Sequence, residues 1–312
     1  MAATIFRRMR RELLKRRAAR AAYVFVHSVT NNIGDLKACP KAYFGDDFPS
    51  GSVFPCRHLV ELLREEGHEA GLRLFAGKTI IFGGGGLISF DKHSIHAEVL
   101  LFLKCFADGG GVVVIWGAGH NKTQGFREWY NDAAMERYPA FLSKFALVGL
   151  RDFHGPHRWV PCVSCMDPAF GEERSPRHNV VAFLHGQEDA SRMADFEGVP
   201  TLVNIKRGTK RNVEAQFRKV VDFISSGSCV VTNSYHGLYW ATLLGRPVIA
   251  MANSSKFLSH KYSFVEVNDL ANWRQKLDVA MDRVGHMPYP ALVECRQANI
   301  AFRDAVVQLA KS

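Results

Sequence analysis

The residue of this chain best suited to acid–base chemistry is a histidine in the segment Ser234-Tyr235-His236-Gly237. The segment follows an apolar run, Cys229–Thr232, that is typical of a buried parallel strand. Ser234 is a favourable helix N-cap residue, and Gly245-Arg246-Pro247 would end the helix. His236 would then lie in the first helical turn, where free backbone N–H groups and the helix dipole bind anions. A helix-capping histidine in an ordinary strand–helix–strand unit has the same pattern, so the segment alone leaves both interpretations open.

Other polar residues are expected at the same edge of the sheet. The apolar segment Tyr23–His27 predicts a strand, and the tight turn Asn32-Ile33-Gly34-Asp35 after it would project Asp35 near the carboxyl end of that strand. Arg151-Asp152 is a charged pair at another predicted strand end. Open α/β sheets bind ligands at this edge, although a plain turn would explain the first motif equally well.

Glycines follow two predicted strands. The strand at Thr79–Phe82 runs into four consecutive glycines, and the strand at Val112–Trp116 ends in Gly117-Ala118-Gly119. Such glycines let the backbone approach either a ligand or another part of the chain. They do not form the G-x-G-x-x-G pattern, so dinucleotide binding is not favoured.

The bulk properties favour a globular protein of two domains. A chain of 312 residues is longer than one simple hydrophobic core can accommodate. Its contents of 47% hydrophobic and 22% charged residues are ordinary for a folded protein. It has no apolar run of about 20 residues for a membrane span, and its basic N-terminus lacks the apolar core of a secretory signal. Seven cysteines, an odd number, favour a cytoplasmic location over a disulfide framework. Cys162 and Cys165 form a lone C-x-x-C, which favours buried small residues, and no cluster has metal-ligand spacing, so we expect no metal and no cofactor.

The positive charge is concentrated at the N-terminus. Of the net charge of +10, residues 1–20 supply +7, while the rest of the chain holds 32 basic and 29 acidic groups. A nearly neutral body argues against nucleic-acid binding. Residues 5–22 predict a basic amphipathic helix whose apolar side is formed by Ile5, Phe6, Met9, Leu13 and Leu14. This helix could lie on an anionic membrane, peripherally on the inner face of the cytoplasmic membrane, or remain solvated, or pack on the fold.

Strand and helix patterns alternate, which predicts an α/β protein with parallel sheets. A first alternation covers residues 23–172 and includes a helix predicted over Val53–Gly67. The polar stretch Gly171–Asn179 would link it to a second alternation over residues 173–312, whose last helix could cross back. We therefore expect two Rossmann-like lobes with a cleft between them, after an N-terminal segment of residues 1–22.

The ordered set of these motifs resembles the polysaccharide pyruvyl transferase family from residue 23 to residue 250. No single motif is specific, whereas their order and spacing are. The motifs are Asn32-Ile33-Gly34-Asp35, Gly83–Leu87, Trp116-Gly117-Ala118-Gly119, Arg151-Asp152, Asp167-Pro168-Ala169-Phe170 and Ser234-Tyr235-His236-Gly237 with Gly245-Arg246-Pro247-Val248-Ile249. The resemblance implies a fold like that of GT-B glycosyltransferases and phosphoenolpyruvate as donor. It also implies that a pyruvate ketal is placed on a sugar of a bacterial cell-surface polysaccharide or its lipid-linked precursor.

The resemblance also suggests roles for individual residues. His236, with a pKa near 7, would protonate the enol carbon of the donor. Asp35 would accept the proton of a sugar hydroxyl once the lobes close, with Asp167 as the second candidate, although an aspartate before proline more often caps a turn. The candidate substrate-binding residues are Arg151, Ser234, Tyr235, Gly237, Asn32, Gly84 and Gly85.

The chain departs from the family at one position. Many members carry an arginine two residues before the motif histidine, where this chain has Ser234. Other cations must then hold the anionic donor, and the local candidates are Lys206, Arg207, Lys256 and Lys261. On the acceptor side, Trp129 and Tyr130 could stack on a sugar face.

Two other functions fit the same pattern. A GT-B-type glycosyltransferase using a nucleotide sugar would need a ribose-binding carboxylate in the second lobe, for which Glu266 is the nearby candidate. A non-catalytic family member that acts at the membrane would fit Ser234 and the basic N-terminus.

Overall fold

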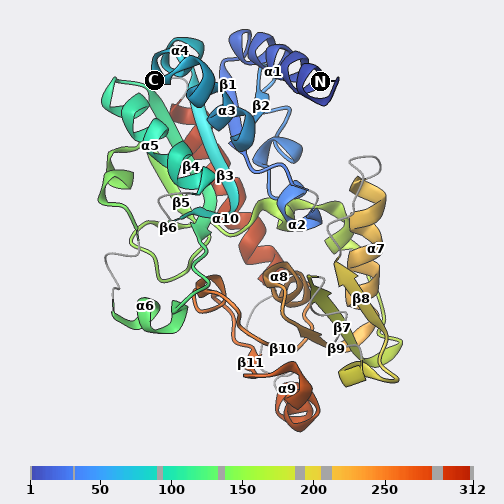
Figure 1. The fold of residues 1–312 in the computed structure, drawn as a ribbon. Helices are drawn as coiled ribbons and strands as arrows, with labels where there is room; N and C mark the ends of the chain where they lie inside the picture. The colour runs from blue at the N-terminus through green and yellow to red at the C-terminus, as the bar shows by residue number, and fades with distance from the viewer. Residues whose placement is uncertain are drawn as a thin grey trace.

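The computed structural model describes residues 2–30, 32–89, 94–132, 138–186, 194–204, 213–282 and 291–309, with the backbone alone described for residues 2–8 and 132. These residues form two parallel sheets, one in each of two lobes (Figure 1). The first sheet, in the order β2-β1-β3-β4-β5-β6, consists of β1 (Tyr23–His27), β2 (Ser52–Pro55), β3 (Thr79–Ile88), β4 (Val112–His120), β5 (Leu147–Leu150) and β6 (Arg158–Trp159). The second, in the order β11-β10-β9-β7-β8, consists of β7 (His178–His185), β8 (Thr201–Asn204), β9 (Gly227–Thr232), β10 (Val248–Ala250) and β11 (Val265–Glu266). The predicted fold class, α/β with two parallel-sheet lobes, is confirmed.

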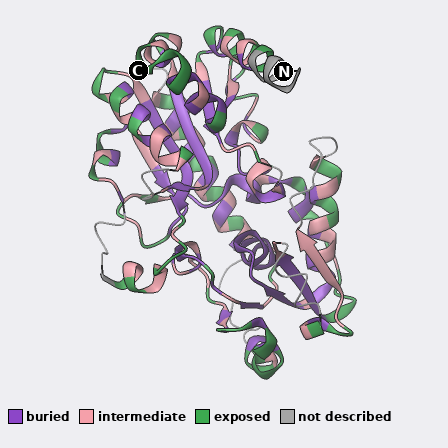
Figure 2. Cartoon of the chain, viewed as in Figure 1, coloured by how far each residue is buried: buried purple, intermediate pink, exposed green. Residues whose placement is uncertain are grey.

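Helices surround both sheets, as parallel strand pairing requires. The described helices of the first lobe are α1 (Ala2–Ala19), α2 (Ile33–Leu36), α3 (Cys56–Glu66), α4 (His68–Phe75), α5 (Ile95–Asp108) and α6 (Phe126–Asp132). Those that follow β8 are α7 (Val213–Ser225), α8 (Tyr235–Leu243), α9 (Leu277–Met281) and α10 (Ala291–Leu309). Burial follows this layering, because the strands are largely buried and the helices are exposed on their outer sides (Figure 2).

Three local predictions were wrong, and one of them is the end of β4, which was expected at Trp116 and lies at His120. The helix expected over Val53–Gly67 begins only at Cys56, because residues 52–55 pair with β1 as strand β2. β3, expected to end at Phe82, continues through the four glycines to Ile88. It can do so because Gly84 and Gly85 adopt positive φ angles of 77° and 95°, which few other residues reach, and the pairing register with β4 shifts just after them.

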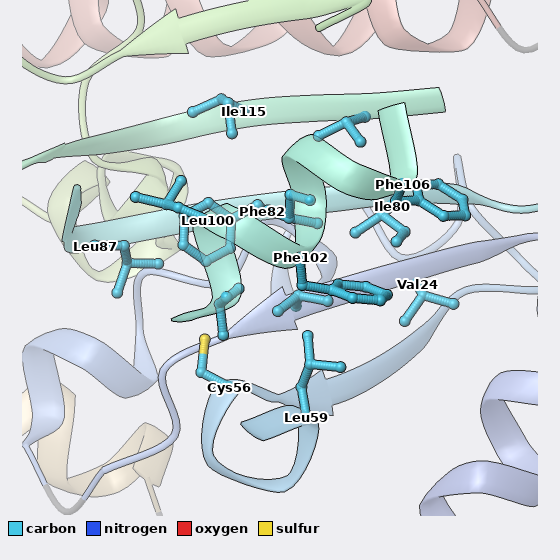
Figure 3. Packing of buried hydrophobic residues seen from close by; sticks show 14 of the residues in the cluster. Val24, Cys56, Leu59, Ile80, Phe82, Leu87, Leu100, Phe102, Phe106 and Ile115 are labelled. Atoms are coloured by element: carbon cyan, nitrogen blue, oxygen red, sulfur yellow. The ribbon is translucent and has the colours of Figure 1, made fainter. Parts of the chain in front are cut away.

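The core of the first lobe lies between its sheet and helices α3, α4 and α5. Phe102 of α5 packs in one cluster with Leu59 of α3 and with Ile80 of β3 (Figure 3). Its ring centre lies 5.9 Å from that of Phe75 in α4. Each such fully buried side chain contributes about 1.5–3 kcal/mol to folding. Packing of α3, α4 and α5 therefore stabilises the sheet and fixes the position of its carboxyl edge.

The last helix, α10, packs against the first sheet although it follows the second lobe in the sequence (Figure 1). Phe302 and Val306 are buried in one cluster with Phe25 and Trp116. Asn299, also buried, accepts a hydrogen bond from Trp116 Nε1 at 3.0 Å. This helix therefore ties the two lobes together.

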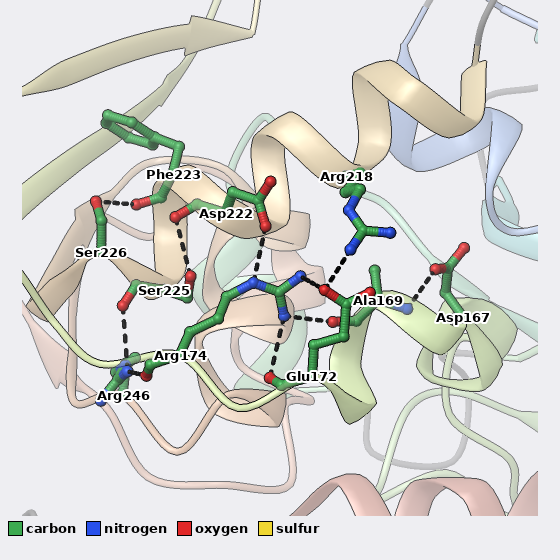
Figure 4. A network of polar contacts seen from close by, with 10 residues as sticks. All are labelled: Asp167, Ala169, Glu172, Arg174, Arg218, Asp222, Phe223, Ser225, Ser226 and Arg246. Atoms are coloured by element: carbon green, nitrogen blue, oxygen red, sulfur yellow. Dashed lines mark hydrogen bonds and ion pairs between the residues drawn. The ribbon is translucent and has the colours of Figure 1, made fainter.

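The stretch expected to link the lobes is held by a polar network (Figure 4). Arg174 donates to Asp222 of α7 at 2.7 Å and to the carbonyl oxygen of Ala169 at 2.5 Å. Arg246 donates to the carbonyl oxygens of Arg174 at 2.8 Å and Ser225 at 3.1 Å. The arginine of the Gly245-Arg246-Pro247 motif thus fixes this stretch to the second lobe.

A buried lysine joins α2 to the second lobe. Lys37, at the C-terminus of α2, lies 2.7 Å from Asp167 Oδ2 and also forms an ion pair with Glu214 of α7. Asp167 additionally caps the following turn by accepting a hydrogen bond from the amide of Ala169 at 2.9 Å. The second candidate base is therefore engaged in structure, away from the cavity described below.

Candidate functional site

A cavity of about 430 Å³ lies between the carboxyl edges of the two sheets. Four residues of the second lobe that line it follow β9 directly or lie in the first turn of α8: Asn233, Ser234, Tyr235 and His236. The rest of the lining is Ser28, Thr30, Asn32, Asp35, Gly86, Leu87, His96, Asn121, Arg151, His185 and Lys256. The structure thus gathers most of the predicted polar site residues around one space.

Helix α8 positions His236 by its first turn. The hydroxyl oxygen of Ser234 accepts a hydrogen bond from the amide of Gly237 at 3.3 Å, so Ser234 is the N-cap. The imidazole is 7% exposed and lies 5.1 Å from the Trp240 ring, with 31° between the planes. Gly34 of α2 also lies against the imidazole, and a Cβ atom there would lie only 2.0 Å from His236 Nδ1. The ring therefore fits between the lobes because residue 34 has no side chain.

The pKa of His236 differs from the sequence-based expectation. Burial lowers it well below its usual 6.5, and the positive charges of Arg151, Lys256 and His185 lower it further. A pKa near 7 was expected from the sequence, whereas this imidazole is buried beside cations. In the ligand-free protein His236 is therefore neutral at pH 7.

Lys256 supplies a further positive charge, and its side chain is partly buried. Loss of hydration and the nearby charge of Arg151 lower the pKa of its ammonium group from 10.5 to about 8, while Asp35 opposes the shift. Among the described residues, no carboxylate forms an ion pair with Lys256. A partly desolvated cation without such a partner favours binding of an anion in the cavity.

Arg151 is held rigidly at the end of β5. Its Nη2 donates to the carbonyl oxygen of His120 at 3.0 Å, and its guanidinium carbon lies 4.5 Å from the centre of the Tyr235 ring. The neighbouring Asp152 accepts hydrogen bonds from the amide of His120 at 2.8 Å and the hydroxyl of Tyr138 at 2.9 Å. Arg151 thus presents a fixed guanidinium to the cavity, while Asp152 serves the scaffold.

Asp35 lines the cavity from the first lobe. Asn32 caps α2 by accepting a hydrogen bond from the amide of Gly34 at 2.9 Å. One carboxylate oxygen of Asp35 accepts a hydrogen bond from Thr30 Oγ1 at 2.7 Å, which fixes its direction. His27 lies behind it, with its ring nitrogens 2.7 Å from the carbonyl oxygens of Gly83 and Asp35. The sequence pattern did not single out Thr30 or His27, although both lie at the end of β1.

The glycine motifs contribute less to the cavity than expected. A Cβ atom at Gly84 would lie 1.7 Å from the carbonyl oxygen of Ala38, so Gly84 serves close backbone packing. A Cβ atom at Gly237 would likewise lie 2.4 Å from Thr232 Oγ1 and 2.7 Å from Phe183 Cδ1, so this glycine also serves close packing. Neither of them lines the cavity, and neither does Gly85, whereas Gly86 does.

Replacing Gly84 by alanine is expected to lower the free energy of unfolding by about 2–3 kcal/mol. The positive φ of 77° is unfavourable for alanine, and the new methyl group would overlap the Ala38 backbone. The midpoint of urea unfolding measures this loss. Gly171→Ala is the control, because no atom lies within 4 Å of a Cβ there and its φ is not positive. An unchanged midpoint with weakened ligand binding would instead favour a ligand contact at Gly84.

The remaining predicted residues lie elsewhere. Lys261 pairs with Glu294 and lies 4.3 Å from the Trp159 ring, outside the cavity lining. Glu266, the candidate ribose-binding carboxylate, pairs with Arg127. Tyr130 accepts a hydrogen bond from Ser259 at 3.2 Å, and the Trp129 ring lies 5.2 Å from His120. Lys206 and Arg207 fall outside the described residues.

Sequence reasoning missed several lining residues. They share a position just beyond a strand end: Ser28 after β1, Asn121 after β4 and Asn233 after β9, with His185 as the last residue of β7. Asn233 also connects β9 to β7, because its side-chain oxygen accepts a hydrogen bond from the amide of His185 at 2.8 Å. The sequence marks these residues only by their position after an apolar run. Single polar residues at such positions also occur in ordinary turns, so the position alone does not indicate a binding site.

Comparisons with known proteins place this geometry in a family. The model of the family described as polysaccharide pyruvyl transferase matches residues 32–255, more than half of the chain. A search of curated proteins gave no match.

Solved structures show weak similarity over nearly the whole chain. A putative UDP-N-acetylglucosamine 2-epimerase from Listeria monocytogenes is 8% identical, with 94% of this chain and 98% of that chain covered and a TM-score of 0.49. The glycotransferase of kitacinnamycin is 10% identical, with 94% and 99% covered and a TM-score of 0.46. Neither similarity bears on activity. The ordered motifs, the match over residues 32–255 and the histidine seated at the interlobe cavity lead to one conclusion: the chain belongs to the polysaccharide pyruvyl transferase family and is a transferase.

Proposed function

We propose that the protein is a ketal pyruvyltransferase that moves the enolpyruvyl group of phosphoenolpyruvate onto two hydroxyls of one sugar and releases phosphate. The acceptor is a sugar of a bacterial cell-surface polysaccharide or of its lipid-linked precursor. The observation that carries this proposal is the convergence of His236, Arg151 and Lys256 on one cavity that Asp35 lines from the other lobe. Transfer from an anionic donor to a hydroxyl requires a proton donor, cations that bind the donor and a base. The imidazole, the guanidinium with the ammonium group, and the carboxylate supply these three functions.

The donor's charges suit this environment. Phosphoenolpyruvate carries a carboxylate and a phosphate, and the guanidinium of Arg151 and the ammonium of Lys256 can pair with them. The first turn of α8 adds backbone N–H groups beside them. We assign these groups to donor binding and to stabilisation of the departing phosphate.

Donor binding also prepares His236 for proton transfer. Nearby positive charge holds its pKa down in the empty site, and the donor's negative charge would oppose that effect and raise the pKa. The protonated imidazole then gives its proton to the enol CH₂ carbon, which makes the adjacent carbon electrophilic. A sugar hydroxyl adds to that carbon as Asp35 takes its proton. Phosphate then leaves with the electrons of the C–O bond and takes the proton from Asp35, while the second hydroxyl closes the ketal and returns its proton to His236.

The affinity for phosphoenolpyruvate is expected to fall above pH 8. The pKa of Lys256 is about 8 in the free protein, so at higher pH the donor must bind a neutral lysine or bring a proton with it. The dissociation constant should therefore rise by up to about tenfold per pH unit above 8. Titration calorimetry on both sides of pH 8 measures this.

A matched pair of variants identifies the group that causes this pH dependence of phosphoenolpyruvate binding. Lys256→Met should bind weakly and lose the inflection near pH 8, whereas Lys261→Met, which removes a lysine outside the cavity, should keep it. An inflection that persists in Lys256→Met would assign the titration to another group.

The experiment that tests the function is mass spectrometry of acceptor products. A panel of lipid-linked and synthetic glycosides is incubated with phosphoenolpyruvate, and the mass gain of a pyruvate ketal is sought together with phosphate release. Thermal shift separates the main alternative, because a nucleotide-sugar glycosyltransferase would be stabilised by UDP or GDP and not by phosphoenolpyruvate. A non-catalytic member would give no ketal with any acceptor.

The state of the cysteines supports a cytoplasmic site for this reaction. All seven are free thiols, and all except Cys105 are buried. Such residues persist in a reducing compartment, so we place the reaction in the cytoplasm.

A further inference from the structure

Helix α1 has two chemically different faces. The inner face packs on the first lobe: Ala18 is fully buried, Leu14 packs against the core, and Arg11 pairs with Glu65 of α3. Lys15 pairs with Glu66 at 2.9 Å on the same side. The structure therefore separates apolar residues that the sequence pattern grouped together, because Leu14 packs against the core whereas Met9 and Leu13 are exposed.

The outer face of α1, taken together with Arg20 just after its last residue, consists of Met9, Arg10, Leu13, Arg16, Arg17 and Arg20, and all six are exposed. Met9 is 66% and Leu13 49% exposed, although both are large and apolar. The spacing 9, 13, 16, 20 places four of the six residues on one stripe of the helix. In the part of the chain that the structure describes, none of the four arginines has an ion-pair partner.

We propose that the outer face of α1 binds an anionic phospholipid surface. Four unpaired arginines around two exposed apolar side chains match the chemistry of phosphate headgroups above acyl chains. An ordinary solvated face would mix acidic residues with basic ones, whereas Glu12 is the only acid within residues 1–20 and it faces Lys15 at 3.2 Å.

The position of the helix is compatible with catalysis. α1 lies at the end of the first lobe that is far from the second lobe (Figure 1). A bilayer bound there would leave the interlobe cavity open to donor and acceptor. No described helix is long and apolar enough to cross a bilayer, so the association would be peripheral.

Cosedimentation of the full chain with vesicles tests the proposal. Vesicles of equal parts phosphatidylcholine and phosphatidylglycerol should bind the protein, and vesicles of phosphatidylcholine alone should not. Each arginine near such a surface strengthens binding about fivefold. Changing Arg10, Arg16, Arg17 and Arg20 together to Gln should therefore weaken binding by more than about a hundredfold, and Met9→Gln with Leu13→Gln by roughly tenfold.

Matched variants control for charge and for exposed apolar area. Changing the exposed Lys144, Arg177, Lys219 and Lys276 to Gln removes the same charge, and Leu101→Gln with Val279→Gln removes two exposed apolar side chains, all away from α1. Both controls should bind like the wild type, and high salt should weaken binding by the wild type. Equal binding to neutral vesicles, no binding to anionic ones, or equal losses in outer-face and control variants would overturn the proposal. Circular dichroism confirms that each variant is folded, and no outcome depends on the acceptor sugar.

Discussion

Replacement of His236 by alanine is expected to lower kcat/KM for phosphoenolpyruvate by about a thousandfold, since positioned proton transfer contributes factors of this order. The imidazole is the titratable donor in the first turn of α8, and it lies beside the two cations that we assign to the donor. Without it, the enol carbon has no fixed proton source. The rate of phosphate release in the presence of acceptor measures the loss.

Two variants separate chemistry from packing. His260→Ala removes a partly buried histidine, whose ring centre lies 6.0 Å from that of Tyr235 but which does not line the cavity. It should keep most of the activity. His236→Gln fills nearly the same space without a titratable group and should be as inactive as His236→Ala. Activity close to wild type in His236→Gln would remove the proton-transfer role from this residue.

The fold could be predicted because its strands are continuous apolar runs. β1 was predicted with the bounds it has, and β9 and β10 were placed by the same periodicity. β3 was predicted too short, because glycines usually end strands and only the backbone geometry shows Gly84 and Gly85 continuing one. β2 was missed because four residues before a helix carry too little periodicity to separate from it.

The sequence could predict which residues meet at the candidate site, but it could not predict their electrostatic environment. His236, Arg151 and Asp35 were named because they follow strand ends, and such ends meet at one edge of a sheet. The lowered pKa of His236 depends on its burial and on the charges of Arg151, Lys256 and His185. Gly34, which packs against the imidazole, lies about 200 residues away in the sequence. Such contacts between distant segments leave no local pattern.

Ser234 also shows that the sequence identifies residues of the site without showing how its charges are arranged. The sequence showed that an arginine common in the family is absent there, without showing what compensates for it. In the structure Ser234 caps α8, and the cavity receives positive charge from Arg151 of the first lobe and Lys256 of the second. Lys256 was one of four lysines and arginines named, and only its placement beside Arg151 distinguishes it from Lys261, which pairs with Glu294.

Gly34→Ala is expected to lower kcat by at least about a hundredfold, because small displacements of a catalytic group have effects of this size. The substitution would ordinarily favour a helix. Here the new Cβ would lie 2.0 Å from His236 Nδ1, and the buried imidazole, with the Trp240 ring 5.1 Å away, has little room to shift. The lobes must then separate or the imidazole must turn away from the donor. Steady-state rates with phosphoenolpyruvate and acceptor measure the effect, and Gly171→Ala should match the wild type.

A double-mutant cycle shows whether the effect of Gly34 acts through His236. If Gly34 only makes room for the imidazole, Gly34→Ala should cost almost nothing further in a protein that already carries His236→Ala, since that change removes the ring with which the methyl group collides. Overpacking alone would lower the free energy of unfolding by about 1–3 kcal/mol, which urea unfolding of the single variant measures separately. Equal losses of activity from Gly34→Ala in both backgrounds would show that the glycine serves the fold of α2 and does not position the histidine. Strong coupling would show that Gly34 of the first lobe positions the imidazole of His236, the proposed proton donor in the second lobe.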